Sequence, residues 1–220
     1  MPDVGDENAE FTFARVQFNM TFEALFDREA PWHHDYPYAE DLYLGLVAEY
    51  TGVHTSPEAY QIVQLDSEDI FRFPFVYISE PGFMDLTDAE EVNLREYFER
   101  GGFAMFDDFR GVDLDHLRLQ MKKLFPNREM FQLEIQDPLF SSFFEIDSLQ
   151  MDPPYTDNRF SGLPEFWSMR DEHGRLIMIA NQNNDLGEFW EGLDRGDVSL
   201  ESSAKAVRLG VNYLMYAMEH

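Results

Sequence analysis

The sequence contains no cysteine among its 220 residues. This absence excludes disulfide bonds, a thiolate metal site and a cysteine nucleophile. Any reaction that depends on a catalytic thiol is therefore excluded for this chain.

Basic residues are scarce, with 16 Lys and Arg against 43 Asp and Glu, which gives a formal net charge of −27. Such a charge repels phosphate backbones and anionic membrane surfaces, so we expect no nucleic-acid partner. The acidic residues are spread along the whole chain, which favours a solvated surface that serves solubility over a functional acidic surface. A high-salt habitat would account for the charge equally well.

Long apolar runs are missing too, because no stretch of 18 or more apolar residues occurs. We expect no membrane insertion by this segment. The first ten residues lack the basic and apolar regions of an export signal. The sequence does not decide between an envelope and a cytoplasmic location, because a chain whose export signal had been removed would have the same sequence.

Aromatic residues are plentiful, with 21 Phe, 10 Tyr and 3 Trp, and 44% of the chain is apolar. This composition supplies a core for one packed domain, and a second full domain would be cramped. We therefore predict a flexible acidic lead-in over residues 1–10 and a single α/β domain over residues 11–220.

The stretch from Phe73 to Phe109 is the most informative part of the chain. It contains an apolar strand (74–78), a helix with a capping-box pattern (87–100), a Gly-Gly stop and a second apolar strand (103–106) that ends in Asp107 and Asp108. This order is typical of a βαβ unit, whose two strands are parallel.

Periodicity predicts the remaining elements. The expected strands are 11–18, 60–65, 130–135, 143–149, 166–170 and 176–180, the last two joined as a hairpin by a turn over 171–174. The expected helices are 39–50, 113–125 and 204–218, with Asp113 as the cap of the second.

In an open α/β sheet, ligands bind beyond the carboxyl ends of the strands. The candidate ligand-binding residues are therefore Asn19, Trp32, Asp35, Tyr36, Ser79, Glu80, Gly82, Asp107, Asp108, Asn184 and Asp185. Glu80, Asp107 and Asp108 are the candidate catalytic groups, and adjacent Asp107 and Asp108 could bind a divalent cation if a third group turned toward them. The favoured alternative is that these two aspartates cap a turn or the helix near Asp113.

Two further motifs are weaker. His33, His34 and Asp35 are ligand types, but adjacent residues rarely bind one ion, so a surface or core role is favoured for the histidines. Residues 181–187 suggest a calcium loop, but Leu186 and Gly192 stand where an EF-hand needs Gly and Glu. We expect a loop turned toward the crevice instead, and assign no metal site.

An ordered set of motifs resembles the bacterial domain of unknown function DUF4159. The set comprises Phe11-Thr-Phe-Ala-Arg-Val-Gln-Phe18, Trp32-His-His-Asp-Tyr-Pro37, Phe73-Pro-Phe-Val-Tyr-Ile78, Leu94-Arg-Glu-Tyr-Phe98 with Gly101-Gly-Phe103, Asp107-Asp108, Phe125-Pro126, Asn184-Asp-Leu-Gly187 and Leu209-Gly-Val-Asn212 with Tyr216-Ala217. The resemblance covers nearly the whole chain from about residue 11.

The resemblance implies a flavodoxin-like three-layer sandwich, similar to class I glutamine amidotransferases and ThuA-like proteins. It implies a mostly parallel central sheet with a small β-hairpin extension in the C-terminal half. Members often follow an export signal or membrane segments, which favours an envelope location. The resemblance also leads us to expect a histidine near Glu80 and another at Gln136 or Asp137, and this chain has neither. Amidotransferase chemistry requires a cysteine and is excluded.

Three functions follow as hypotheses. The first is a noncatalytic module of an envelope system, without a cofactor, that binds an unknown small molecule or protein partner. Carboxylates beside aromatic rings suit a sugar or polyol. The second is a hydrolase, possibly metal-assisted, with Asp107 or Glu80 as base; it requires at least two of Glu80, Asp107, Asp108 and Asp185 to converge. The third is a scaffold subunit of an envelope complex.

Overall fold

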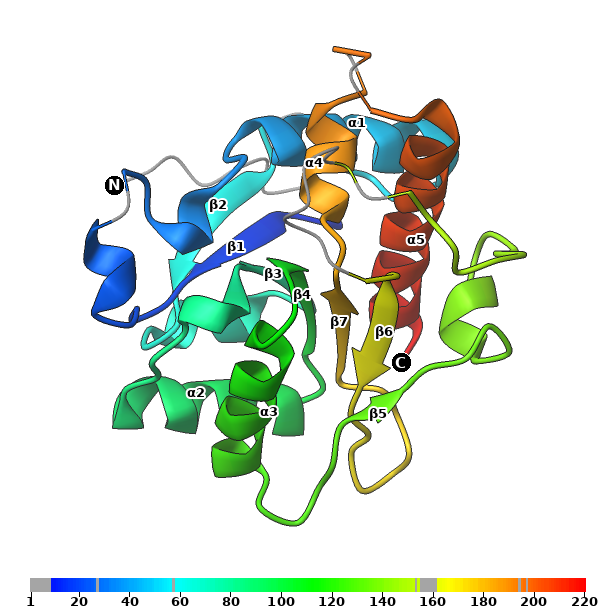
Figure 1. Ribbon diagram of the computed structural model, residues 1–220. Coiled ribbons are helices and arrows are strands. Elements are labelled where there is room, and N and C mark those ends of the chain that lie inside the picture. Colours follow the sequence, from blue (N-terminus) through cyan, green and yellow to red (C-terminus); the bar gives the residue numbers. More distant parts are fainter. Residues whose placement is uncertain are drawn as a thin grey trace.

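The computed structural model describes residues 9–26, 28–56, 58–152, 154, 162–193, 195–196 and 198–220. The expected lead-in falls mostly on residues 1–8, outside the described residues. Within the described part, the chain forms a mixed, mostly parallel α/β sheet with helices on both faces (Figure 1). The expected α/β class is confirmed.

The sheet has the strand order β2-β1-β3-β4-β7-β6-β5. Its strands are β1 (Phe13–Gln17), β2 (Tyr60–Gln64), β3 (Phe75–Ser79), β4 (Phe103–Phe109), β5 (Phe131–Gln132), β6 (Glu165–Ser168) and β7 (Met178–Gln182). The neighbouring pairs from β2 to β7 are parallel. β6 pairs antiparallel with β7, and β5 pairs antiparallel with β6. The chain reverses its direction of travel across the sheet between β1 and β3, and ligands bind at such a switch point in open α/β sheets.

The helices cover the two faces unequally. Their bounds are α1 (Tyr38–Tyr50), α2 (Asp88–Glu99), α3 (Asp113–Leu124), α4 (Leu186–Glu191) and α5 (Leu200–Glu219), with 3-10 turns η1 (Glu23–Phe26), η2 (Pro31–His33), η3 (Glu68–Arg72), η4 (Pro81–Phe83) and η5 (Pro138–Ser141). α1, α4 and α5 lie on one face, and α2 and α3 on the other (Figure 1). None of the helices in the described ranges is long and apolar enough to cross a membrane.

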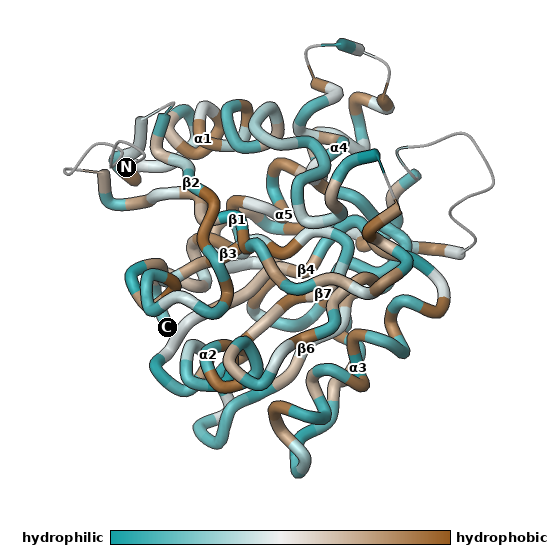
Figure 2. Tube along the Cα trace, turned by 90° about the vertical axis from the view of Figure 1, so that its left-hand side faces the viewer, coloured by the Kyte–Doolittle hydropathy of each residue, from teal (hydrophilic) through white to brown (hydrophobic). Residues whose placement is uncertain are grey.

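Each face of the sheet has its own apolar core. In β3, Phe75 and Tyr77 belong to the core under α1, α4 and α5, whereas Val76 and Ile78 belong to the core under α2 and α3. This division follows the two-residue period of a strand. Figure 2 shows the apolar residues along the central strands, between the two helical layers.

The βαβ unit forms as its sequence predicts. Thr87 and Glu90 make a reciprocal capping box at the start of α2, in which Glu90 accepts the Thr87 amide at 2.8 Å. At the other end, a Cβ on Gly102 would lie 2.3 Å from the ring of Tyr97. Only glycine fits at this position, so the helix ends where the chain turns into β4.

Some expected elements are wrong or misplaced. Residues 143–149 form no strand, because the side chain of Asn212 on α5 takes the backbone partners a strand would use: its Oδ1 accepts Phe144 N at 2.7 Å, and its Nδ2 donates to Phe144 O at 2.8 Å. β5 is reduced to two residues, and β4 continues through both aspartates to Phe109. α5 begins at Leu200, four residues earlier than expected, because Ser199 caps it.

Candidate functional site

The segment that follows β1 is anchored by Arg15. This arginine is fully buried in the middle of β1 and forms an ion pair with buried Glu40 of α1. Its Nη1 also donates to the backbone carbonyls of Trp32 at 3.2 Å and His34 at 2.7 Å. Charge-assisted bonds of this kind hold their acceptors firmly. The carbonyls of Trp32 and His34 are thus fixed over the carboxyl end of the sheet.

Three ligand-type side chains meet at this edge, and we call them the His34 cluster: His34, Glu80 and Asp108. His34 Nδ1 lies 3.3 Å from Glu80 Oε1 and 3.7 Å from Asp108 Oδ2. The three side chains come from the segment after β1, the residue after β3 and the end of β4. The imidazole is 41% exposed, whereas the two carboxylates are 16% and 11% exposed.

A second acidic group, Asp35, Asp185 and Glu188, lies nearby and is called the Asp35 cluster. Each of its residues offers an oxygen within 4.8 Å of the others. A Cβ placed on Gly187 would meet Asp35 Oδ2 at 3.2 Å and Asp185 Oδ1 at 3.4 Å, so both carboxylates face the start of α4. Asp35 Oδ2 is buried and has no hydrogen-bond partner within the described ranges.

Backbone strain is concentrated at the same edge. Among the described residues other than glycine, those with a positive φ are Asp35 (64°), Glu80 (48°), Asp108 (51°) and Asn183 (54°). Three of the four carry carboxylates of the two clusters. Left-handed backbone of this kind costs about 1 to 3 kcal/mol per residue and tends to occur at functional sites.

Burial and mutual repulsion shift the protonation of the carboxyl groups. Burial, and then the charge of Asp108, raise the pKa of Asp35 to about 8 and hold the pKa of Asp185 well above its usual range. Burial likewise raises the pKa of Glu80. Hydrogen bonds that the His34 imidazole donates to Asp108 and Glu80 raise the pKa of His34 to about 11. Without a bound cation, Asp35 and His34 are therefore both protonated at pH 7.

Asp107 has a structural role at the start of α4. Its Oδ2 accepts the amides of Leu186 at 2.8 Å and Gly187 at 3.1 Å and the hydroxyl of Tyr77 at 3.1 Å, and its Oδ1 accepts Asn181 Nδ2 at 2.9 Å. Burial raises the pKa of Asp107 to about 7. The expectation that Asp107 caps a turn or the helix near Asp113 is wrong, because its carboxylate binds the first amides of α4 instead.

The other predicted site residues divide into four groups. Ser79 is fully buried, and its Oγ has no partner in the part of the chain that the structure describes. Tyr36 packs against Tyr60, and Asn184 Nδ2 contacts Met151 Sδ at 3.5 Å, so both have structural surroundings.

Gly82 is required as glycine, because a Cβ there would lie 2.6 Å from the carboxyl carbon of Asp113. Asn19 and Trp32 line a separate cavity, described below.

Sequence reasoning missed His34, Glu188 and Arg15 as parts of this edge. Of the three, His34 was the easiest to predict from the sequence, since it stands beside Asp35 in the Trp32–Pro37 motif. His34 and Asp35 are adjacent in sequence, but they belong to different clusters. Glu188 follows Asp185 at helical spacing, and this was the only signal for it.

A family model for a domain of unknown function, DUF4159, matches residues 12–218. This chain belongs to DUF4159. The match includes every described member of the His34 and Asp35 clusters, and a comparison with curated proteins finds no match. The family match therefore spans nearly the whole chain. Because DUF4159 is a domain of unknown function, the function is argued from the geometry of the site.

Proposed function

We propose that this DUF4159 domain is a metal-assisted hydrolase whose divalent cation is held by the His34 cluster. The observation that carries the proposal is the meeting of His34 Nδ1, Glu80 Oε1 and Asp108 Oδ2 from three separate segments. Ligand atoms that lie about 2.1 Å from one ion are roughly 3.0 to 3.4 Å apart. The observed distances of 3.3 and 3.7 Å need only a small closure to reach this range.

The number and exposure of the ligands favour catalysis over a purely structural ion. Catalytic metal sites have three protein ligands and an open position for water, and the ion lowers the pKa of that water to about 7. The partly exposed imidazole of His34 leaves the cluster accessible to solvent. One nitrogen and two oxygens suit Mn²⁺ or Zn²⁺ better than Ca²⁺, which prefers oxygen ligands alone.

This proposal changes the order of the sequence hypotheses, which placed a noncatalytic module first. Glu80 and Asp108 both approach the same imidazole nitrogen, and this convergence of two carboxylates supports a hydrolase. Asp107, by contrast, is occupied by four hydrogen bonds and is not the base. The reordering rests on Glu80 and Asp108 alone.

We also propose that the fold is flavodoxin-like and similar to that of class I glutamine amidotransferases. Its support is the order of the parallel strands, which corresponds to 2-1-3-4-5 when β7 is counted fifth. This is the order of flavodoxin-like sheets, whose ligand site lies between the first and third strands. His34 and Glu80 follow those two strands.

The test begins with calorimetric titration of Mn²⁺ and Zn²⁺ into the purified chain. His34→Ala, Glu80→Gln and Asp108→Asn should each weaken binding at least about tenfold, because each removes a ligand. His33→Ala is the matched control, since His33 lies outside the cluster and its Nδ1 pairs with Glu29. Failure of the chain to bind either ion, or equal losses in the control, would overturn the cation site.

The reaction is tested separately with a panel of chromogenic carboxylic esters, phosphate esters and glycosides. The proposal predicts turnover of one class that a chelator abolishes and the same ion restores. Turnover should be lost in Glu80→Gln and kept in His33→Ala. Ion binding without turnover across the panel would contradict the hydrolase and support the noncatalytic module.

A further inference from the structure

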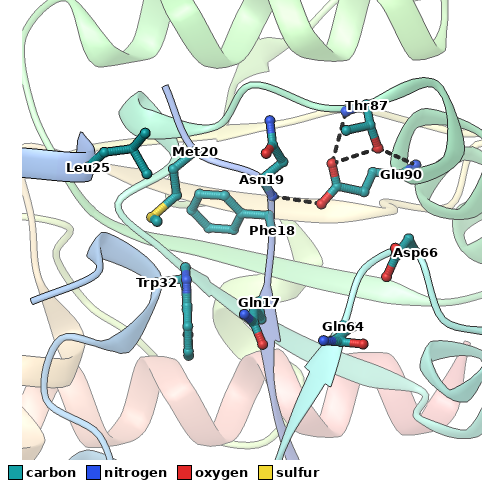
Figure 3. A pocket seen from close by; sticks show the side chains of 10 residues that line it. All are labelled: Gln17, Phe18, Asn19, Met20, Leu25, Trp32, Gln64, Asp66, Thr87 and Glu90. Atoms are coloured by element: carbon teal, nitrogen blue, oxygen red, sulfur yellow. Dashed lines mark hydrogen bonds between the residues drawn. The ribbon is translucent and has the colours of Figure 1, made fainter. Parts of the chain in front are cut away.

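A cavity of about 340 Å³ lies beyond the carboxyl ends of β1 and β2 (Figure 3). It is lined by Gln17, Phe18, Asn19, Met20, Leu25, Trp32, Gln64, Asp66, Thr87 and Glu90. Its volume is at the lower end of the range of about 300 to 1,000 Å³ for small-molecule pockets. Trp32, which lines the cavity, and His34, which belongs to the His34 cluster, are two residues apart on one segment, and Arg15 binds the backbone carbonyls of both.

Three of the polar residues in the cavity are already committed to the fold. Both carboxylate oxygens of Glu90 are occupied, one by the amide of Asn19 at 2.6 Å and the other by the amide and hydroxyl of Thr87. Asn19 donates its side-chain amide to the carbonyl of Asp85 at 2.6 Å. These groups shape the cavity, and the charge of Glu90 is largely compensated.

The remaining polar side chains are free to bind a ligand. Gln17, Gln64 and Asp66 have no side-chain hydrogen-bond partner within the described residues. Gln17 and Gln64 are register partners on adjacent parallel strands, which lie roughly 5 Å apart, so their side chains project to the same side of the sheet. In Figure 3 the two amides lie between the indole of Trp32 and the carboxylate of Asp66.

This arrangement selects the chemistry of a ligand. A primary amide both donates and accepts hydrogen bonds, as a hydroxyl group does. The face of an indole packs against the C–H face of a sugar ring. Among the described residues, no Lys, Arg or His lines the cavity, so anions are disfavoured, and an ammonium group would leave the two amide NH₂ groups without acceptors.

We infer that this cavity binds a neutral sugar or polyol, with the ring on Trp32 and hydroxyl groups on Gln17 and Gln64. The inference deepens the proposed function by naming its substrate class. It rests on the proposed function in one respect, namely that the bound sugar presents the group attached to it to the His34 cluster. Binding itself requires only the cavity. The two claims can therefore fail independently.

The experiment uses the ¹⁵N-labelled full chain and follows the indole N–H signals of its three tryptophans by NMR. The probes are glucose, galactose and N-acetylglucosamine, with glucosamine and glucuronate as cationic and anionic comparators. A neutral sugar should shift the Trp32 signal in a saturable manner and leave fully buried Trp190 unchanged. Binding of only glucosamine, only glucuronate or none of the five would overturn the inference.

Variants locate the binding. Gln17→Ala and Gln64→Ala should each weaken sugar binding about two- to tenfold, and these side chains are not needed for folding. Trp32→Ala should weaken it by a similar factor. Gln132→Ala on β5, at the opposite edge of the sheet, and Trp167→Ala on β6 are the matched controls. Equal losses in the controls would contradict the assignment to this cavity.

The same titrations with chelator present, and in His34→Ala, separate the two proposals. Sugar binding that persists without the ion supports the cavity even if the cation site fails. Ion binding that persists in Gln17→Ala and Gln64→Ala, with no sugar bound by the native chain, overturns the cavity and leaves the cation site standing.

Discussion

Arg15 and Glu40 form an ion pair in which both side chains are fully buried. Because the same guanidinium holds the carbonyls of Trp32 and His34, this pair supports both the cavity and the cluster. Glu40→Gln leaves a buried charge without its counter-ion, which costs about 3 to 5 kcal/mol. Urea unfolding should show this loss, whereas Glu49→Gln, on the exposed side of α1, should be near neutral.

An unchanged free energy of unfolding in Glu40→Gln would show that Arg15 is stabilised by its carbonyl acceptors alone. In the same variant, binding of Mn²⁺ should weaken as well, because the backbone of His34 loses a fixed anchor. Retention of full affinity for the ion would contradict the anchoring role of Arg15.

Glu80 has a left-handed backbone, with φ 48° and ψ 55°. Glu80→Gly should stabilise the metal-free protein by about 1 kcal/mol, because glycine adopts this conformation without strain. It should also abolish ion binding. Glu80→Ala is the matched control, since it removes the carboxylate but keeps the Cβ; if it is stabilised as much as Glu80→Gly, strain is not the cause.

The acidic edge makes stability depend on pH in an unusual direction. The pKa values of Asp35 and Asp107 are raised to about 8 and about 7 from an ordinary value of 3.8, so the native state binds these protons more tightly than the unfolded state. Their contribution is fully present below about pH 4 and is lost as pH rises through 7 to 8. In metal-free buffer, the free energy of unfolding should therefore fall between about pH 5 and pH 9.

Saturating Mn²⁺ should reduce this decline, because its charge beside Asp108 offsets the repulsion that raises the pKa of Asp35, and because the ion binds more tightly as His34 loses its proton. Asp107→Asn should flatten the part of the curve near pH 7. Metal-free stability that rises steadily from pH 5 to pH 9 would contradict the shifts.

Asp107 holds the start of α4 through the amides of Leu186 and Gly187. In Asp107→Asn, an NH₂ group replaces one of the two accepting carboxylate oxygens. This group then faces other donors, so about 2 kcal/mol or more of stability should be lost. Hydrogen exchange of the α4 amides should accelerate. Asp137→Asn, which affects one backbone bond from Glu134 and a 3.4 Å contact with partly exposed Arg170, should lose less. Equal effects would show that the network around Asp107 is not cooperative.

Local sequence patterns predicted most of the helices and strands. The capping box at Thr87 and the run of apolar residues from Phe103 predicted α2 and β4 because these signals depend on residues close in sequence. The strand expected over residues 143–149 was wrong because its backbone partners come from Asn212, far along the chain. Periodicity contains no information about such a partner.

The candidate site was predictable only in part for the same reason. Strand-end position correctly brought Glu80 and Asp108 to one edge, but it assigned Asp107 to the site as well. Side chains alternate along a strand, so adjacent Asp107 and Asp108 project in different directions. The tertiary structure decides which of the two aspartates faces the crevice. It also brings His34 to Asp108, which the sequence does not indicate.

The central claim is that the His34 cluster binds a divalent cation, and its most direct test is anomalous diffraction from crystals soaked in Mn²⁺. The account predicts one peak between His34 Nδ1, Glu80 Oε1 and Asp108 Oδ2, about 2.0 to 2.3 Å from each, and absent in Asp108→Asn. A map with no peak in the native crystals, or with its strongest peak elsewhere, would contradict it.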